Sequence, residues 1–306
     1  MIVFFLIFAA VILGGSYYSY RIAFHYPEEL RGKTPSVKAP QYDPYRPRMR
    51  EIYRALADRP CEIVTIRSHD GLTLSARYYH VADCAPLDIC CHGYKSHPFT
   101  DFSGGSQLCF NLGHNVLLID QRAQHDSQGK CMTFGILERR DVLSWVNYAI
   151  NRFGKDVKIT LYGVSMGGAT VLMVAELPLP ENVKGIVADC PFAVPVEIIL
   201  EVGRKLHYPP NLIRPFLYIA AGLYGGFRLG ETDAIRAVTN TKVPIVIIHG
   251  KDDSYVPCAM SEPIALANPK MVRRYTFPGA EHAISYLVDT PRYSQIITDF
   301  VNEILA

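Results

Sequence analysis

The chain has 306 residues, of which 49 % are hydrophobic and 20 % charged, with a formal net charge of +2. This is the composition of a globular protein with a sizeable core, and the small charge gives no reason to invoke nucleic acid. The eight cysteines form no Cys-x-x-Cys and no zinc-like pairing with histidine, so no metal site is predicted and a reducing compartment is favoured.

The first 24 residues differ from the rest. Residues 2–15 carry no polar side chain, and the first charge is Arg21. About 20 apolar residues span a bilayer, so residues 1–24 are predicted to be an uncleaved membrane anchor. A signal peptide, which normally has a basic start, and a helix docked on the domain are the alternatives. Residues 21–50 hold seven Lys/Arg against three acids, which by the positive-inside rule places the remaining chain on the cytoplasmic side.

Residues 25–60 are rich in proline and arginine and are predicted to be a linker with a short helix at 47–57. From residue 61, strands alternate with helices, which predicts an α/β fold with a mostly parallel twisted sheet covered on both faces. The first two strands alternate like an antiparallel pair. Strands are expected at 62–67, 72–79, 87–91, 115–120, from 158, 183–189, 243–249 and 271–277, and helices at 104–112, 138–152, after 165 and at 291–305.

The rhythm breaks at 194–240, where two apolar helical patterns, 196–207 and 212–224, separate two strands. An insertion there lies above the carboxyl edge of the sheet, where ligands bind in such folds. We therefore expect one domain, 61–306, with a small helical cap at 194–240. Its large apolar residues could roof a pocket, although at least half are expected only to pack the cap onto the core: Leu206, Tyr208, Leu212, Phe216, Tyr218, Tyr224 and Phe227.

The chain is organised around residues 158–175, an apolar β-branched run followed by a helical run rich in Ala, Leu and Met. Between them lies Gly163-Val164-Ser165-Met166-Gly167, the nucleophile-elbow pattern, which exposes a serine hydroxyl at a sharp strand-to-helix turn. Ser165 is therefore the predicted nucleophile, and a serine that only caps the helix is the alternative. The backbone N–H of Met166, directly after it, is a predicted oxyanion donor.

A serine hydroxyl needs a base, and the base needs an orienting acid. Of ten histidines, His282 lies in the loop directly after the last predicted strand, at the same sheet edge as the elbow. His92 is the nearest alternative. For the acid, Asp252 and Asp253 both follow the penultimate strand. Asp189, which ends the strand before that one, is either a third candidate or a buried carboxylate that braces the loop.

These residues resemble the α/β-hydrolase superfamily, and the resemblance covers about residues 60–304. In that family's acid loop the aspartate stands three positions before a valine, which matches Asp253 and Val256 and favours Asp253 over Asp252. The chain order Ser165, Asp253, His282 is also the order that this fold uses. The resemblance therefore implies a catalytic triad of these three residues.

Two further stretches carry the resemblance. His-Gly at 92–93, after the third strand, is similar to the family's oxyanion motif and implies the backbone N–H of Tyr94 as the second donor. Residues 120–145 look like a bacterial branch labelled lysophospholipase-like or prolyl-oligopeptidase-like. That branch carries His-Gly where this chain has Gln124 and His125, in a structural loop beside the pocket.

Residues and resemblance together predict a serine hydrolase that cleaves a carboxylic ester, with a small or lipid-like acyl group, through an acyl-enzyme. A serine triad needs no cofactor, and no P-loop or dinucleotide fingerprint is present. An anchor would hold the enzyme near lipids. The alternative is a serine peptidase or aminopeptidase of the prolyl-oligopeptidase type, although only about 60 residues precede the first strand, where such enzymes usually carry a propeller. A non-catalytic membrane-tethered scaffold is the third hypothesis.

Overall fold

The computed structural model describes residues 1–33 and 40–306. One sheet contains β1 (Glu62–Arg67), β2 (Thr73–Tyr79), β3 (Leu87–Cys91), β4 (Asn115–Ile119), β5 (Ile159–Val164), β6 (Val183–Asp189), β7 (Ile245–Gly250) and β8 (Val272–Phe277). The α-helices are α1 (Ile2–Ser19), α2 (Arg46–Ala57), α3 (Pro98–Asn111), α4 (Glu138–Phe153), α5 (Met166–Val174), α6 (Pro195–Lys205), α7 (Pro210–Leu223), α8 (Ala234–Val238), α9 (Glu262–Ala267), α10 (Ser285–Val288) and α11 (Thr290–Leu305). A π-helical turn, η1 (Tyr20–Phe24), continues α1.

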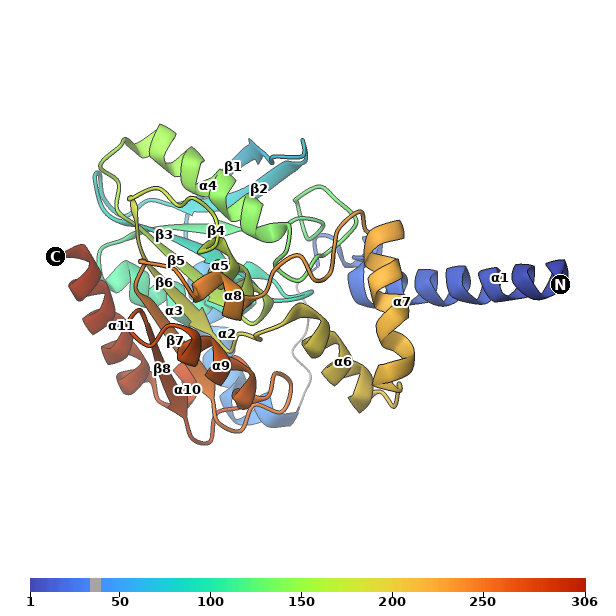
Figure 1. Cartoon of the computed structure of the whole chain (residues 1–306). Coiled ribbons are helices and arrows are strands. Elements are labelled where there is room, and N and C mark those ends of the chain that lie inside the picture. The colour runs from blue at the N-terminus through green and yellow to red at the C-terminus, as the bar shows by residue number, and fades with distance from the viewer. Residues whose placement is uncertain (34–39) are drawn as a thin grey trace.

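The strands run in the order β1-β2-β4-β3-β5-β6-β7-β8 across the sheet (Figure 1). The β1–β2 and β2–β4 pairs are antiparallel, and every later neighbouring pair is parallel. This mostly parallel sheet confirms the predicted fold class. Because β5, β6, β7 and β8 are parallel neighbours, the loops after them leave the sheet at one edge.

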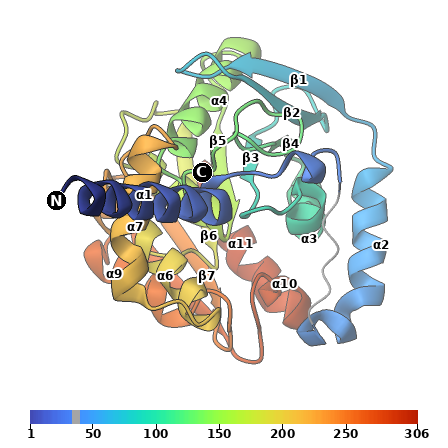
Figure 2. The ribbon, with the colours of Figure 1, turned by 90° about the vertical axis from the view of Figure 1, so that its right-hand side faces the viewer.

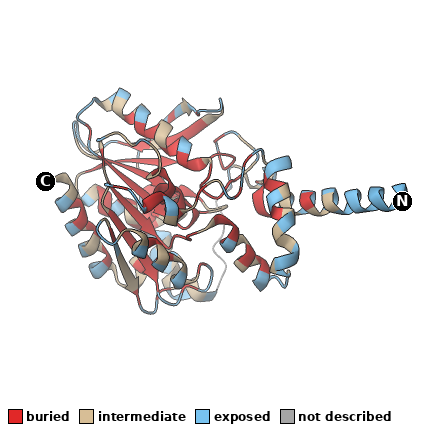
Figure 3. Cartoon of the chain, in the orientation of Figure 1, coloured by how far each residue is buried: buried red, intermediate tan, exposed pale blue. Residues whose placement is uncertain are grey.

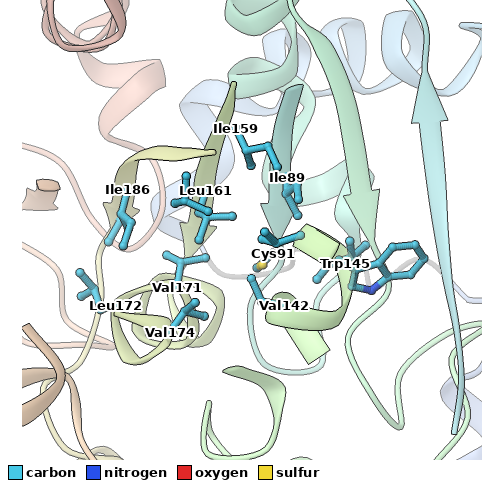
Figure 4. Packing of buried hydrophobic residues seen from close by; sticks show 14 of the residues in the cluster. Ile89, Cys91, Val142, Trp145, Ile159, Leu161, Val171, Leu172, Val174 and Ile186 are labelled. Atoms are coloured by element: carbon cyan, nitrogen blue, oxygen red, sulfur yellow. The ribbon is translucent and has the colours of Figure 1, made fainter. Parts of the chain in front are cut away.

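Helices cover both faces of the sheet and bury two cores. On one face, α4 and α5 pack on the strands, and Figure 4 shows Val142 and Val171 facing Ile89 and Leu161. On the other face, α2, α3 and α11 cover a second cluster. The adjacent cysteines Cys90 and Cys91 point to opposite faces and belong to different cores, as expected for neighbours in a strand. Figure 3 shows the buried sheet between its partly exposed helices.

A third core lies beyond the carboxyl edge of the sheet and joins the cap to the N-terminal segment. Phe24 of η1 is fully buried there, with ring centroids 5.3 Å from Phe227 and 5.9 Å from Phe134. The cap helices α6 and α7 pack on one another, and α7 also packs against α1. Figure 2 shows α1, α6 and α7 gathered at one side of the molecule and α2 and α3 at the other.

The N-terminal helix projects from the body of the protein (Figure 1). With η1 it forms an apolar helix of 23 residues, Ile2–Phe24, which is long enough and apolar enough to cross a membrane. At 1.5 Å per residue it is about 35 Å long, compared with about 30 Å for the hydrocarbon core of a bilayer. Its first residues are exposed, as Figure 3 shows. By length and composition it could be an anchor or a signal sequence.

The chain that follows η1 is attached to the body by backbone and side-chain hydrogen bonds. The N–H of Met132 donates to the carbonyl of Phe24 at 2.7 Å, and the N–H of Tyr26 donates to the carbonyl of Lys130 at 3.1 Å. The guanidinium of Arg31 donates to the carbonyls at 125, 127 and 129. Further on, α2 packs on α3. Residues 34–39 of the expected linker lie outside the described residues.

The helix expected at 104–112 begins earlier, at Pro98. Proline is favoured in the first turn of a helix, and the ring Nδ1 of His97 accepts a hydrogen bond from the N–H of Phe99 at 3.1 Å. The short helices α8, α9 and α10 were not expected, because segments of four to six residues show no helical period.

Candidate active site

Ser165 stands at the turn between β5 and α5 with φ +56° and ψ −116°. A positive φ is rare for a residue with a side chain and persists only where the surroundings hold it. The N–H of Ser165 donates to the carbonyl of Asp189 at 2.8 Å, which ties the turn to β6. A Cβ on Gly163 would collide with the carbonyl of Gly167, and a Cβ on Gly167 with that of Cys91. The turn therefore requires glycine at both positions.

Two loops bring a histidine and an aspartate to this serine. Asp253 follows β7 and His282 follows β8. Nε2 of His282 lies 3.0 Å from Oγ of Ser165, although 117 positions separate the two residues. Nδ1 of His282 lies 2.7 Å from Oδ2 of Asp253. The structure thus brings together a hydroxyl, an imidazole placed to take its proton, and a carboxylate that holds the imidazole.

The carboxylate of Asp253 is held on both oxygens. The N–H groups of Tyr255 and Val256 donate to Oδ1 at 2.9 and 2.8 Å, and Nε2 of His249 lies 3.4 Å from Oδ2. Burial alone would raise the pKa of Asp253, but hydrogen bonds from His249 and His282 outweigh it and hold the pKa below its ordinary value. Asp253 therefore stays ionised and fixed in orientation.

The alternative acid and base have other partners. Asp252 is exposed, and its Oδ2 accepts from the N–H of Gly279 at 2.7 Å. His92 is buried: its Nδ1 lies 2.9 Å from the carbonyl of Gly93, and its Nε2 accepts from the N–H of Gln121 at 3.1 Å. Burial lowers the pKa of His92 well below its ordinary value, so the ring stays neutral. Within the described residues, neither side chain is hydrogen-bonded to Ser165.

Asp189, the third candidate acid, braces the elbow. Its carbonyl accepts from the N–H of Ser165, and its Oδ2 accepts from the hydroxyl of Tyr293 at 3.1 Å. Burial raises the pKa of Asp189 to about 6. The carboxyl group is thus engaged with α11, on the side of the sheet away from the cap.

The loop after β3 is fixed against the elbow. The N–H of Gly93 donates to Oδ2 of Asp101 at 2.7 Å, and a Cβ on Gly93 would lie 3.3 Å from Cβ of Ser165. The next residue, Tyr94, has its hydroxyl bonded to the carbonyl of Ala23 at 2.9 Å. This arrangement holds the backbone at 93–94 beside the serine and links it to the N-terminal segment.

Met166 begins α5, so its N–H belongs to the first turn, where the helix itself supplies no acceptor. Met166, Tyr94 and Ser165 all line one cavity. The positive end of the α5 dipole also points toward this position. Negative charge that develops beside Ser165 would therefore be favoured.

Ser165 lies between two cavities. The first, about 280 Å³, is almost wholly apolar, and the second, about 240 Å³, is more polar. Apolar side chains from the cap and the core line the first, among them Phe134, Phe192, Ile198, Val202 and Phe216. Polar groups line the second, among them Tyr42, Lys95, Ser96, Asp101 and His282. A ligand bound at Ser165 could therefore place an apolar group on one side of the serine and a polar group on the other.

The cap residues that sequence analysis singled out divide into two sets. Leu206, Tyr208, Leu212 and Phe216 line the apolar cavity. The other three do not: Tyr218 is exposed, Tyr224 packs on α1, and Phe227 packs on η1. Three of the seven therefore do not line the cavity, which is fewer than the half or more that we expected only to pack the cap.

Gln124 and His125, where the chain differs from the His-Gly of the related bacterial branch, support the loop after β3. Oε1 of Gln124 accepts from the N–H of Lys95 at 2.8 Å, and Nε2 of His125 lies 2.5 Å from the carbonyl of Ser96. His125 has φ +49°, a conformation that glycine adopts freely, which fits the glycine of the related branch. Its ring also lies 4.5 Å from that of His97.

Sequence reasoning missed three residues that hold the site. His249 supports Asp253, and its position four residues before that aspartate was a signal that could have been used. Asp101 holds the N–H of Gly93, and the hydroxyl of Tyr42 donates to the carbonyl of His282 at 3.0 Å. Neither lies in a recognisable pattern, so only the structure shows their role.

Two groups of side chains in the described residues are spaced closely enough to hold a metal ion. In the first, Cys190 lies beside Asp253 and His282, but burial raises the pKa of the Cys190 thiol well above its ordinary value, and the other two are paired together. In the second, which contains His69, both carboxylates bind one arginine: Asp70 and Asp141 with Arg122. Neither group is arranged as a metal site.

Comparison with known proteins bears on the fold that carries this site. Residues 89–228 match the family model described as alpha/beta hydrolase fold. The chain is 28 % identical to the uncharacterized protein YqkD of Bacillus subtilis, over 73 % of this chain and 74 % of that protein. It is 25 % identical to the uncharacterized protein Rv2307c of Mycobacterium tuberculosis, over 78 % and 79 % of the two chains. Among solved structures, the Pyrococcus furiosus esterase Pf2001 superposes with a TM-score of 0.68 at 20 % identity, covering 83 % of this chain and 94 % of that one.

These comparisons confirm the fold that the sequence predicted. The family match contains Ser165 but ends before Asp253 and His282. The two relatives carry no assigned activity, and the structural likeness, at 20 % identity, speaks for the fold alone.

Proposed function

We propose that the chain is a serine hydrolase of the α/β-hydrolase superfamily, one that cleaves carboxylic esters through an acyl-enzyme. The observation that carries the proposal is the hydrogen-bonded series from Asp253 through His282 to Ser165, with distances of 2.7 and 3.0 Å. An unbroken series of this kind activates a serine hydroxyl, whatever the fold that presents it.

In the proposed mechanism, Oγ of Ser165 attacks the ester carbonyl while its proton passes to Nε2 of His282. Asp253 holds the Nδ1–H tautomer and stabilises the imidazolium that forms. The tetrahedral oxyanion accepts hydrogen bonds from the backbone N–H groups of Tyr94 and Met166. His282 then returns the proton to the leaving alcohol as the bond to oxygen breaks. A water molecule then attacks the carbonyl of the acyl-enzyme while its proton passes to His282. His282 returns the proton to Oγ of Ser165 as the carboxylic acid leaves.

The two cavities support a division of the substrate. The acyl group would occupy the apolar cavity, whose lining offers almost no polar partner. The alcohol would occupy the polar cavity, where Lys95, Ser96 and Tyr42 could contact hydroxyl or anionic groups. A lipid-like ester with one acyl chain and a polar alcohol fits this division. We also propose that Ile2–Phe24 anchors the enzyme, with the catalytic domain on the cytoplasmic side, as the Lys/Arg excess in residues 21–50 favours.

The test uses the full-length protein in detergent, since Phe24 belongs to the core. A fluorophosphonate probe should label the protein, and p-nitrophenyl butyrate should be hydrolysed. Ser165→Ala should remove the label and lower turnover by about 10⁴-fold or more. Full activity in Ser165→Ala would refute the proposal. Aminoacyl-naphthylamides assayed in parallel would reveal a peptidase, since the same triad could serve it.

A further inference from the structure

The N-terminal segment forms one wall of the apolar cavity beside Ser165. The cap helices α6 and α7 supply another part of the lining. A helix that served only as a tether would not need to touch the site. The residues of this wall are Gly15, Tyr18 and Ser19 of α1, and Ile22 and Ala23 of η1.

Contacts fix α1 against the cap at this wall. The hydroxyls of Tyr18 and Tyr208 lie 2.8 Å apart, and the hydroxyl of Tyr224 donates to the carbonyl of Leu13 at 3.1 Å. Gly15 faces Phe216 so closely that a Cβ would lie 2.7 Å from the ring. The wall is therefore a packed interface between α1 and the cap.

The cavity runs from a buried inner end to an exposed outer end. Ser165, at the inner end, is 7 % exposed. At the outer end Leu206 and Leu212 are 58 % and 62 % exposed, and Tyr18 is exposed beside the half-buried Tyr208. We call these four outer residues the portal: Tyr18, Leu206, Tyr208 and Leu212. The portal lies where α1 leaves the body of the protein.

The outer face of α7 continues the portal. Leu217, Ala220 and Ala221 are buried toward the body. The opposite face exposes apolar side chains at helical spacing, Leu212, Pro215, Tyr218 and Leu223. Figure 1 shows α7 lying across α1, between the body and the projecting part of α1. This outer face of α7 therefore looks in the direction in which α1 extends.

The geometry restricts what covers this face. If α1 spans a bilayer, the membrane surface crosses it near its C-terminal end, because Arg21 is the first charge after the apolar run. The cap contacts α1 between Leu13 and Tyr18, just inside that level, so α7 would lie in the interfacial layer of the bilayer. Contact with lipid would then cover the outer face of α7, which would otherwise expose its leucines to water.

We infer that the acyl chain of a single-chain lipid ester reaches Ser165 directly from the bilayer, through the portal, while the outer face of α7 rests on the membrane. The inference rests on the proposed ester hydrolysis and adds the source and route of the substrate. The cavity volume of about 280 Å³ is slightly below the range for ligand pockets, roughly 300–1,000 Å³, which suits one chain better than two.

The first experiment compares two presentations of one substrate. Full-length protein is reconstituted into vesicles of diether phosphatidylcholine, and 1-stearoylglycerol is placed either in the same vesicles or in a separate population. Removing the chain from a bilayer costs about 0.8 kcal/mol for each CH₂, so hydrolysis in the same vesicles should be faster by at least about tenfold. Equal rates would overturn the inference.

The second experiment alters the outer face of α7 without touching the cavity lining. The double variant Tyr218→Asp with Leu223→Asp is compared with Ile63→Asp with Leu266→Asp, whose side chains are also exposed but lie on β1 and α9. The α7 variant should lose about tenfold or more on co-reconstituted 1-stearoylglycerol and stay within about twofold on p-nitrophenyl acetate. The control should keep both activities.

Each result has a distinct meaning. An α7 variant that matches its control on the vesicle substrate, or that loses both activities equally, overturns the membrane contact. In either case p-nitrophenyl acetate hydrolysis by the parent, abolished in Ser165→Ala, leaves the proposed function standing. Failure of the parent to hydrolyse p-nitrophenyl acetate would instead remove the proposed function itself.

Discussion

At the scale of single residues, the acid loop after β7 is the best place to test the proposed triad, because it offers two adjacent aspartates. Only Asp253 contacts His282; Asp252 is exposed and accepts from the N–H of Gly279. The local sequence offers both aspartates as the acid, and the geometry of the turn directs only one of the two carboxylates to His282. Adjacent residues of one type are thus a built-in comparison between a proposed catalytic group and a structural one.

We expect Asp253→Asn to lower kcat for p-nitrophenyl butyrate by about 10⁴-fold, because an amide cannot hold the Nδ1–H tautomer of His282. Asp252→Asn should stay within about threefold, since surface substitutions away from the site perturb little. Steady-state kinetics of both variants, with circular dichroism to verify folding, gives the comparison. Equal losses in the two variants would contradict the assignment of the acid.

At the scale of elements, the strand–turn–helix unit of β5 and α5 depends on close backbone approach. Gly163 and Gly167 leave room for carbonyl groups of the turn and of β3, and the strained Ser165 is held by the carbonyl of Asp189. The effect of a Gly→Ala substitution on the free energy of unfolding therefore depends on where the glycine lies. For two glycines of this chain we expect opposite effects.

Gly167→Ala should lower the free energy of unfolding by about 3 kcal/mol or more, because its Cβ would overlap the carbonyl of Cys91 and the central strand cannot move aside. Gly105→Ala, inside α3, should be neutral or stabilising by about 0.5–1 kcal/mol, since alanine is the better helix former. Its Cβ would meet only Phe102, at 3.6 Å. Urea unfolding measures both, and a stable Gly167→Ala protein would contradict the packing described for the elbow.

At the scale of the whole molecule, the N-terminal segment belongs partly to the globular body. Residues 1–15 mostly project from it, whereas Phe24 and Tyr26 are buried and bonded through the backbone to residues 130–132. The boundary between the helix and the body therefore falls inside the segment of Ile2–Phe24, not after it.

Removal of residues 1–15 should release the protein from membranes and leave a folded body. Removal of residues 1–26 should destabilise it by about 3–5 kcal/mol, the usual effect of losing one buried phenylalanine. Carbonate extraction followed by thermal unfolding of the soluble fractions measures both effects, with Phe24→Ala in the full chain as the matched control. Release of the full-length protein by carbonate would rule out a spanning helix.

Much of the fold was predictable because it follows from local patterns. The strands from β1 to β8 were expected within about two residues of their observed bounds, since alternation, apolar runs and turn residues are local signals. The start of α3 was missed because its first turn, Pro-Phe-Thr-Asp, has weak helix propensity and is supported by the ring of His97. The strand order, with β4 between β2 and β3, has no local signal at all.

The sequence by itself determined the elbow, the candidate side chains at 165, 253 and 282, and a long apolar N-terminus, because motifs and hydrophobic runs are written in neighbouring residues. Only the tertiary structure decided that these three side chains meet, that His249 supports Asp253 while Asp101 holds the loop after β3, and that η1 closes the third core. It also decided that α1 forms a wall of the cavity beside Ser165. The contact of His282 with Ser165 and the shared cavity of α1 and Ser165 join residues more than a hundred positions apart, and they follow from packing and sheet order rather than from any local preference.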